Sequence, residues 1–383
     1  MRGQIRKRGN SYVAIIYKGK DFQGKKRYQW ISCRTKREAQ AKLAQLVHEH
    51  DIGIYADPKG TLGEFATRWL VEYAVPNLAP RTTEGYQSII RAHVMTKLGQ
   101  IPLKDLKPEH LQKYYANLLA GGLTTTTAAH HAALLHRILE HAMRWQLLAR
   151  NPADGVSPPR ARHIEMHTLD EAQAEKILEE AKSTPYFYIY HLALFSGLRQ
   201  SELLALRWCD IDLVMAEISV SRTMHRLLTH EIIFRTTKTP KSRRTVALSP
   251  KACTTLRQHL DIEKSQCVRL GIEFTDDRLI FCQWDGAPLK PLSISQAWRR
   301  LTSRLGIENI RFHDLRHTHA TLMLQQGVHP KIVQERLGHS TISVTLDRYS
   351  HVTPGIQRKA ADAFDEIMTP QNSKRIANAI NET

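Results

Sequence analysis

Four short segments in the second half of the chain each carry a side chain suited to handling a phosphodiester group. In the first, residues 194–206, Arg199 follows Gly197 in an otherwise apolar stretch, where glycine permits a turn between two helices. A cation in such surroundings needs an anionic partner. Glu202, at i+3, either orients Arg199 toward an external anion or forms with it a buried salt bridge of structural value alone. The residue pattern leaves both interpretations open.

The second segment is a basic loop at residues 236–244, flanked by two strand-like runs. A lysine on such a turn can reach a leaving group and give it a proton. Arginine is a poor acid because its pKa lies above about 12. The loop therefore predicts contact with phosphate, and it offers both Lys238 and Lys241 as the proton donor.

The third segment, residues 312–324, has the pattern of a helix with His313 and Arg316 on one face, at i and i+3. An imidazole and a guanidinium so placed can hold nonbridging phosphate oxygens and exchange a proton. His317 and His319 raise a rival hypothesis, a metal-dependent nuclease, because His313 and His317 have zinc-ligand spacing. The glutamate of an H-E-x-x-H motif is absent, however, and this absence disfavours a metal site.

The fourth segment, residues 337–351, places His339 after Gly338 at a turn and Tyr349 ten residues later. Tyrosine has a pKa near 10 and is a weak nucleophile at neutral pH, so it needs adjacent cations or a base before it can attack. The other three segments offer such groups. The four segments together could therefore carry out attack on a phosphodiester.

These segments lie in a predicted third domain, residues 165–354, which is mainly helical and begins at a capping box in residues 168–171. A proline-containing linker at residues 151–167 precedes it. A small sheet is expected within it, with the last two strands forming a hairpin around the basic loop. The expected strands are residues 217–221, 231–234 and 245–248.

A second domain, residues 61–157, is predicted to be all helical, starting at a capping box in residues 61–64. An amphipathic stripe recurs at i, i+4 and i+8 through Leu134, Leu135, Ile138, Leu139, Ala142 and Trp145. Four histidines lie in or beside this helix without supporting carboxylates or cysteines, and solvated or phosphate-facing imidazoles are expected rather than a metal site. They are His130, His131, His136 and His141.

The N-terminal segment, residues 1–56, is predicted to form strands at residues 12–17 and 27–32, followed by a helix with a capping box at residues 35–38. Aromatic residues alternate there with lysine and arginine. We expect at least half of them to pack the sheet on its helix and the rest to form a nucleic-acid face. They are Tyr12, Tyr17, Tyr28 and Trp30.

Composition agrees with a nucleic-acid partner. The 383 residues carry a formal charge of +18, and residues 1–60 hold 14 Lys/Arg against 5 Asp/Glu, hence +9 in under a sixth of the chain. Concentrated positive charge suits a polyanion. No run of about 18 apolar residues is present and the start lacks a signal-peptide pattern, so we expect neither a membrane-spanning nor a secreted protein. Five scattered cysteines argue against a disulfide framework or a structural zinc site.

Taken in this order, the four segments resemble the active site of the tyrosine recombinase, or phage integrase, family, and nearly the whole chain resembles the three-domain integrases of temperate phages and conjugative transposons. In that family the site comprises an Arg, a Lys on a β-hairpin, a His-x-x-Arg, a His in a Leu-Gly-His turn and a Tyr nucleophile. The matching residues here are Arg199, Lys238, His313, Arg316, His339 and Tyr349. The position relative to residues 245–248 favours Lys238 over Lys241.

The resemblance implies a multidomain α+β architecture. Residues 1–56 would be an arm-type DNA-binding domain of β-sheet plus helix, residues 61–157 an all-α, SAM-like core-binding domain, and residues 165–354 a mainly α catalytic domain with a small antiparallel sheet, the DNA breaking-rejoining enzyme fold. Residues 355–383 would be a tail whose short helix docks onto a neighbouring protomer or packs in cis. The apolar face of that helix comprises Ala360, Ala361, Phe364, Ile367 and Met368.

The resemblance also implies a site-specific recombinase that integrates or excises a prophage or mobile element through a 3′-phosphotyrosyl bond to Tyr349 and a Holliday junction. Arg199, Arg316 and His339 would stabilise charge on the phosphate, His313 would exchange a proton with Tyr349, and Lys238 would protonate the 5′-oxygen. No cofactor and no metal is expected, because the phosphotyrosine keeps the bond energy.

The partners implied are double-stranded DNA at core and arm attachment sites, further protomers in a homotetramer, and DNA-bending and excision-directionality proteins. The expected location is the cytoplasm of a bacterial host, on the nucleoid, without a membrane. Besides the metal-dependent nuclease, two rival functions remain, a type IB topoisomerase and a non-catalytic DNA-binding regulator. The arm-like N-terminal segment argues against the first, and six intact candidate residues argue against the second.

Overall fold

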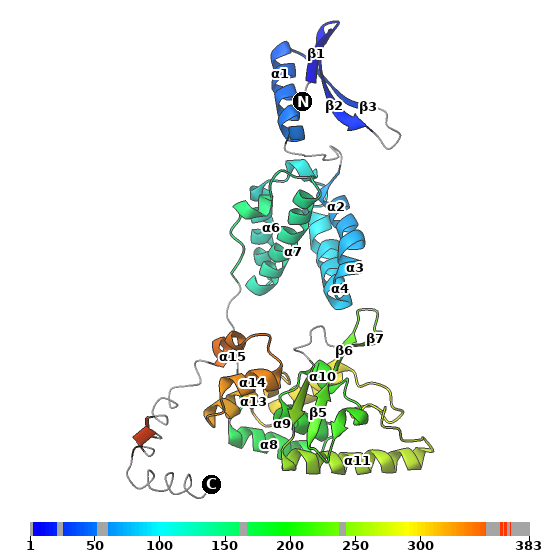
Figure 1. Cartoon of the computed structure of the whole chain (residues 1–383), viewed down its shortest axis with the longest axis vertical. Helices are drawn as coiled ribbons and strands as arrows, with labels where there is room; N and C mark the ends of the chain where they lie inside the picture. The colour runs from blue at the N-terminus through cyan, green and yellow to red at the C-terminus, as the bar shows by residue number, and fades with distance from the viewer. Residues whose placement is uncertain are drawn as a thin grey trace, which may run out of the picture. The chain divides into compact units, whose positions relative to one another are not determined.

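The computed structural model describes residues 3–20, 26–51, 60–160, 167–236 and 243–349, together with residues 361, 362, 364, 365 and 368. The chain divides into two compact units, Met1–Ile164 and Glu165–Thr383. The helical part of the first unit and the second unit have separate hydrophobic cores, and the second unit has a further small cluster at Ala320, Leu324, Val333 and Leu337. The expected α+β composition is confirmed, with mainly helical elements and small antiparallel sheets (Figure 1).

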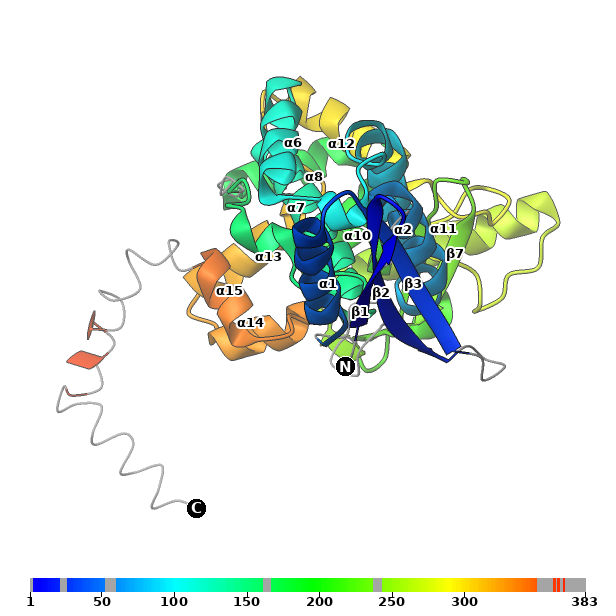
Figure 2. The same cartoon turned by 90° about the horizontal axis from the view of Figure 1, so that it is seen from above.

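Residues 3–20 and 26–51 form a three-stranded antiparallel sheet with one helix packed on it (Figures 1 and 2). Its elements are β1 (Gly3–Arg8), β2 (Ser11–Lys20), β3 (Lys26–Cys33) and α1 (Lys36–Asp51). The sequence predicted β2, β3 and α1 but missed β1, in which Ile5 is the one large apolar side chain. Regular pairing with β2, from Gly3 opposite Ile16 to Arg8 opposite Ser11, makes this basic segment a strand.

The aromatic residues of this sheet divide into two pairs. Tyr12 and Tyr17 are half-buried, whereas Tyr28 and Trp30 on β3 are exposed by 49% and 57%. The rings of Tyr17 and Tyr28 lie 5.5 Å apart. The sheet therefore presents two large aromatic side chains to solvent.

The helical part of the first unit contains four long helical runs. Two of them pass through a short π-helical turn without interruption: α2 (Leu62–Trp69), η1 (Leu70–Ala74) and α3 (Val75–Asn77), then α4 (Pro80–Ile89), η2 (Ile90–Val94) and α5 (Met95–Lys97). The other elements are η3 (Leu103–Asp105), α6 (Pro108–Ala120), α7 (Thr125–Arg144) and η4 (Pro152–Gly155). The buried residues of α7 confirm the predicted stripe, with Leu134, Leu135, Ile138, Leu139 and Ala142 in the core.

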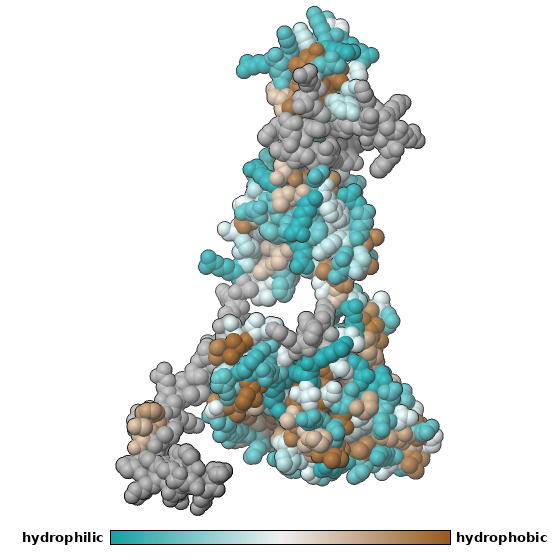
Figure 3. All heavy atoms as spheres, viewed as in Figure 1, coloured by the Kyte–Doolittle hydropathy of each residue, from teal (hydrophilic) through white to brown (hydrophobic). Residues whose placement is uncertain are grey.

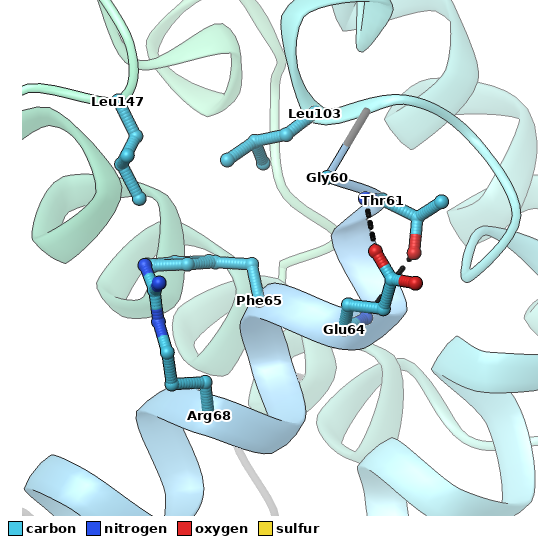
Figure 4. Close-up of a pocket in the computed structure, with 7 residues that line it drawn as sticks. All are labelled: Gly60, Thr61, Glu64, Phe65, Arg68, Leu103 and Leu147. Atoms are coloured by element: carbon cyan, nitrogen blue, oxygen red, sulfur yellow. Dashed lines mark hydrogen bonds between the residues drawn. The ribbon is translucent and has the colours of Figure 1, made fainter. Parts of the chain in front are cut away.

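The predicted capping box at the start of α2 is present and borders a small cavity (Figure 4). Thr61 Oγ1 accepts from the Glu64 N–H, and the Glu64 carboxylate accepts from the Thr61 N–H. The cavity, of about 170 Å³, is lined by the capping box, by the apolar side chains of Phe65, Leu103 and Leu147, and by Arg68. The Arg68 guanidinium lies 5.5 Å from the centre of the Phe65 ring and 5.6 Å from that of Trp145, a cation–π arrangement that covers this edge of the core.

Two of the four histidines near α7 are not solvated, contrary to the prediction. His131 is 1% exposed and its Nδ1 lies 2.8 Å from the Tyr114 hydroxyl. His141 is 8% exposed, and its ring centre lies 3.9 Å from that of Tyr73. Both positions fall in the apolar stripe, three or four residues from buried leucine or isoleucine. Burial lowers the pKa of both imidazoles, in His131 to about 4.

The predicted linker begins later than expected. Asn151 is 3% exposed, its side-chain amide donates to the His136 carbonyl, and its Oδ1 accepts from the Ala153 N–H. Residues 151–155 therefore belong to the helical bundle, because the side chains of Asn151 and Asp154 find a partner at His136, in the middle of α7. Residues 161–166 lie outside the described residues.

The second unit packs its helices around an aromatic centre in which the rings of Tyr190 and Trp298 lie 5.0 Å apart. Its first helix is capped by Asp170 rather than by Thr168, because Asp170 Oδ1 accepts from the Gln173 N–H and the Gln173 side-chain oxygen accepts from the Asp170 N–H. The helices are α8 (Glu171–Ala181), α9 (Phe187–Ser196), α10 (Gln200–Leu203), η5 (Trp208–Asp210), α11 (Pro250–Leu270), α12 (Pro291–Arg304), α13 (Asp314–Gln325), α14 (Pro330–Leu337) and α15 (Ile342–Tyr349).

The strands of this unit form two small sheets, and the predicted hairpin around the basic loop is wrong. They are β4 (Ile211–Asp212), β5 (Glu217–Val220), β6 (Arg222–Arg226), β7 (Ile232–Thr236) and β8 (Arg244–Ala247). Among the described residues β8 pairs with β5 and β7 with β6. Val220 lies opposite Arg244, and Arg222 lies opposite Thr236. The basic loop thus joins two strands that pair in succession with one chain segment, residues 217–226.

The sequence did not predict this pairing, because β6 has arginines at both ends and buries only Met224.

On the face shown in Figure 3, hydrophilic and hydrophobic residues are interspersed over the second unit. The exposed apolar residues of α11 include Ile262, Val268 and Leu270. Within the described residues, no helix has the length and apolar character that crossing a membrane requires.

Candidate active site

Two glycine turns form the framework on which the predicted residues meet. Gly197 ends α9 and Gly338 ends α14, both with φ of 67° in the left-handed region that glycine adopts without strain. A Cβ on Gly197 would come within 2.6 Å of the His319 ring, and one on Gly338 within 2.9 Å of the Arg244 guanidinium. Glycine is therefore required at both positions by conformation and by space.

Arg316 joins the two turns. Its side chain is buried, 3% exposed, in the first turns of α13. Nη1 donates to the Gly197 carbonyl at 2.8 Å, and Nη2 donates to the Leu337 carbonyl at 2.7 Å. The guanidinium thus fixes the ends of α9 and α14 relative to each other.

Arg199 approaches the same place from the start of α10. Its Nη2 donates to the Gly338 carbonyl at 3.2 Å, and its Nη1 donates to Glu202 Oε1 at 2.8 Å. The Arg199 side chain is 35% exposed, whereas that of Glu202 is 2% exposed. The structure therefore brings Arg199 and Arg316 to adjacent carbonyls, with Arg199 open to solvent on one side.

Glu202 contacts a second cation that the sequence did not single out. Arg244, whose side chain is 7% exposed, donates to Glu202 Oε2 through Nη2 at 2.9 Å and to Oε1 through Nη1 at 3.1 Å. Its Nε donates to the Arg336 carbonyl at 2.8 Å. Burial alone would raise the pKa of Glu202, but the hydrogen bonds and charges of Arg244 and Arg199 lower it to about 2. One carboxylate therefore holds α10 and β8 together through two guanidinium groups.

His313 precedes α13 at the exposed side of this cluster. Burial of part of its ring lowers the pKa of His313, and the Arg316 and Arg199 guanidinium groups lower it further, against the opposing effect of Asp314. A lowered pKa keeps the imidazole neutral at pH 7, so that it can accept a proton.

His319 is not available as a ligand for the rival metal site. Its Nδ1 lies 2.8 Å from the Leu194 carbonyl, and its Nε2 accepts from Arg336 Nε at 2.9 Å. Both ring nitrogens are engaged, and burial lowers its pKa to about 3. His317 is buried, with its ring centre 5.2 Å from that of His313. These hydrogen bonds explain His319 as a packing residue between α9 and α14.

His339 lies directly after the Gly338 turn, with 6% of its surface exposed. Gln334 holds its backbone from both sides: the His339 N–H donates to the Gln334 carbonyl, and Gln334 Nε2 donates to the His339 carbonyl. The His339 Nδ1 lies 2.8 Å from Thr345 Oγ1 on α15. Helices α14 and α15 lie side by side in both views (Figures 1 and 2).

Tyr349 is the last residue of α15, and the structure describes its backbone position alone. Lys238 and Lys241 lie outside the described residues. Arg244 and Thr345 are the residues that sequence reasoning missed, although both fall inside the segments chosen for chemistry. The sequence held no signal for Arg244, because the burial of Glu202, which leaves carboxylate acceptor positions for a second donor, is visible only in the folded structure.

Comparison with known proteins agrees with this geometry. A family model described as "Phage integrase family" matches residues 167–355, and one described as "Phage integrase, N-terminal SAM-like domain" matches residues 61–119. The chain belongs to the phage integrase family. The family resemblance inferred from the four segments is thereby confirmed.

Relatives in the phage integrase family align with almost the whole chain. The "Tyrosine recombinase XerC-like" protein of Caldanaerobacter subterraneus subsp. tengcongensis is 27% identical over 381 residues, covering 94% of this chain and 97% of the relative. An "Integrase" of Streptomyces ambofaciens is 29% identical over 364 residues, covering 91% and 92%. By family, this phage integrase is a tyrosine-type recombinase enzyme.

Solved structures share the fold. The Tn1549 transposon integrase, in complex with a circular intermediate DNA, superposes with a TM-score of 0.69 at 20% identity, covering 80% of this chain and 99% of that one. A lambda integrase dimer bound to a COC′ core site gives a TM-score of 0.59 at 19% identity, covering 90% and 94%. The expected fold class of this phage integrase is confirmed.

Proposed function

We propose that the chain is a site-specific DNA recombinase that integrates and excises a mobile element or prophage, with Tyr349 as nucleophile. The convergence of Arg199, Arg316 and His339 on the Gly197 and Gly338 turns supports this most strongly. Two guanidinium groups and an imidazole at one place can bind the nonbridging oxygens of a phosphodiester and stabilise the extra charge of its transition state.

In the proposed reaction, Tyr349 Oη bonds to phosphorus and the bond from phosphorus to the 5′-oxygen breaks, which leaves a 3′-phosphotyrosine. His313 takes the phenol proton, consistent with its lowered pKa. Lys238 gives a proton to the departing 5′-oxygen. A 5′-hydroxyl of a partner strand then reverses these steps, so that strands are exchanged through a Holliday junction without external energy.

The remaining assignments concern DNA and assembly. We assign arm-site binding to residues 1–56, core-site binding to residues 61–157 and catalysis to residues 165–354. The charge of residues 1–60 and the exposed Tyr28 and Trp30 support the first of these. Because a lambda integrase tetramer has been solved on a Holliday junction, we infer a tetramer on DNA here too.

The tail, residues 355–383, is proposed to dock onto a neighbouring protomer, since Phe364 and Met368 are exposed by 62% and 65%. The other residues of its expected apolar face, Ala361 excepted, lie outside the described residues. Directionality and DNA-bending proteins complete the proposed set of partners, acting in the cytoplasm on the bacterial nucleoid.

Covalent capture tests the proposed function. Duplexes that bind the full chain are first selected from a randomised library, then prepared with a nick that lets the cleaved end diffuse away. We expect a protein–DNA adduct that survives denaturant and forms equally in EDTA, because the chemistry uses side chains alone. Cleavage that stops in EDTA and leaves no adduct would contradict the proposal.

The same substrate identifies the proton donor. Lys238→Ala should slow cleavage by about 10²- to 10⁴-fold, the usual contribution of a positioned general acid. A bridging 5′-sulfur in place of the 5′-oxygen should restore the rate, since a thiolate leaves without protonation. Lys241→Ala is the matched control and should cleave at nearly the wild-type rate. The reverse pattern would assign the role to Lys241.

A further inference from the structure

The ring of His339 is joined to the helix that ends at the proposed nucleophile. Its Nδ1 lies 2.8 Å from Thr345 Oγ1, and both residues are buried, with exposures of 6% and 0%. Thr345 stands four residues before Tyr349 in α15, so the two positions share one face of that helix. One hydrogen bond therefore connects the Gly338 turn to α15.

This bond constrains the orientation of the His339 ring. Gln334 fixes the His339 backbone through two hydrogen bonds, so the side-chain torsions are what remains to be set. A buried ring nitrogen without a partner is costly. Thr345 satisfies Nδ1 and thereby selects one orientation of the imidazole.

The Thr345 hydroxyl differs in its partner from those of Thr67 and Thr318, which donate to the carbonyl four residues earlier. In the described part of the chain, the hydroxyl of Thr345 has His339 Nδ1 as its one hydrogen-bond partner. When this hydroxyl donates its proton to Nδ1, the proton of the neutral imidazole lies on Nε2.

We propose that Thr345 is a positioning residue that holds His339 in the Nε2–H tautomer, as a hydrogen-bond donor to the scissile phosphate, while α15 is docked. This inference rests on the proposed role of His339 in the recombinase reaction. Docking of α15 and orientation of His339 are then a single event. A protomer whose α15 is displaced loses its nucleophile and its oriented imidazole together.

Two substitutions of Thr345 distinguish the effect of its hydroxyl from the effect of its side-chain shape. Thr345→Val keeps the branched shape without the hydroxyl, and Thr345→Ser keeps the hydroxyl. We expect the valine variant to form the covalent adduct about ten- to a hundredfold more slowly on the selected nicked duplex, with unchanged DNA affinity, and the serine variant to stay within about threefold of wild type. Thr302→Val is the matched control, because Thr302 is a buried helical threonine that donates to a carbonyl of its own helix.

A spectroscopic readout needs no DNA. Nitrogen-15 NMR of ring-labelled histidines distinguishes protonated from unprotonated ring nitrogens, and the His339 signals are those absent from His339→Gln. Wild type and Thr345→Ser should show a protonated Nε2 at pH 8, and Thr345→Val should show a mixture of tautomers. An unchanged tautomer in Thr345→Val, or in Thr345→Ala if the valine variant does not fold, overturns the inference.

A double-mutant cycle tests whether Thr345 acts through His339. In the His339→Ala background, Thr345→Val should cause no further loss of cleavage rate, because the partner ring is already gone. An equal loss in both backgrounds would show that Thr345 supports something else and would overturn the proposal. If wild type forms no adduct on any selected duplex, the proposed function fails, whereas the tautomer measurement still decides the role of Thr345.

Discussion

Tyr349→Phe should abolish covalent adduct formation, with a rate at least about 10⁴-fold below wild type, as for other removed nucleophiles. The substitution deletes one oxygen atom, the atom that would bond to phosphorus, and keeps the ring. Affinity for the selected duplex should therefore be unchanged. The measurement is the yield of labelled DNA that co-migrates with denatured protein, followed over time with excess enzyme.

Tyr186→Phe provides the matched control, because Tyr186 lies in the same unit and stacks on Tyr190 with ring centres 6.0 Å apart, away from both glycine turns. This variant should form adduct at the wild-type rate. Peptide mapping of the wild-type adduct should place the phosphodiester on Tyr349. An adduct retained by Tyr349→Phe, or mapped to another residue, would show that the nucleophile was wrongly assigned.

Glu202→Gln should reduce both the stability of the second unit and the cleavage rate. A neutral amide leaves the buried Arg244 without its charge partner, and removing one partner of a buried ion pair costs about 3–5 kcal/mol of unfolding free energy. Arg199 also loses the carboxylate that orients it, which should slow cleavage by about 10²-fold. Denaturant unfolding and adduct formation measure the two effects.

Glu263→Gln is the control that distinguishes an effect on folding stability from an effect on the cleavage rate. Glu263 and Arg278 form another nearly buried ion pair in the same unit, at 3.2 Å and with side-chain exposures of 9% and 10%. Glu263→Gln should destabilise the protein comparably and leave the cleavage rate of the folded enzyme unchanged. If both variants cleave at the wild-type rate once folded, Glu202 has no role in orienting Arg199.

The lowered pKa of Glu202 predicts that the folded state becomes less stable at acid pH. Its pKa falls from an ordinary value of 4.5 to about 2 on folding, so its carboxylate stabilises the folded state fully above about pH 4.5. That contribution, about 3 kcal/mol, is lost as the pH falls toward 2. In Glu202→Gln this part of the pH dependence should be missing, whereas acid unfolding equally steep in both proteins would contradict the prediction.

The sequence predicted elements well where one local pattern decides the structure. The α7 stripe through Leu134 and Ile138 and the Thr61 capping box are local, and both are confirmed. Prediction from the sequence failed where the structure of a segment depends on partners that are distant in sequence. β1 is a strand because β2 pairs with it, and β7 and β8 divide between two sheets because residues 217–226 offer each a separate stretch to pair with.

Prediction of the candidate site from the sequence was limited in the same way, because contacts between distant residues determine its geometry. The types and order of Arg199, Arg316 and His339 indicated a shared task, but not which atoms would hold them. Backbone carbonyls at two helix ends accept hydrogen bonds from both arginines. Such contacts cannot be predicted from residue types, because every residue has a backbone carbonyl. Likewise Arg244 is one arginine in a basic loop until folding places it against Glu202. The assignment of His131 as solvated failed because position in the stripe outweighed its polarity.

Arg316 lies between the C-terminal ends of two helices, and helix macrodipoles place partial negative charge at those ends. The local field at its guanidinium is therefore attractive before any nucleic acid arrives. The guanidinium groups of Arg199 and Arg316 would otherwise repel each other and move apart in the free protein. Because the dipoles offset this repulsion during folding, the proposed phosphate site is ordered before DNA binds, and the entropy of ordering it would not reduce the affinity for DNA.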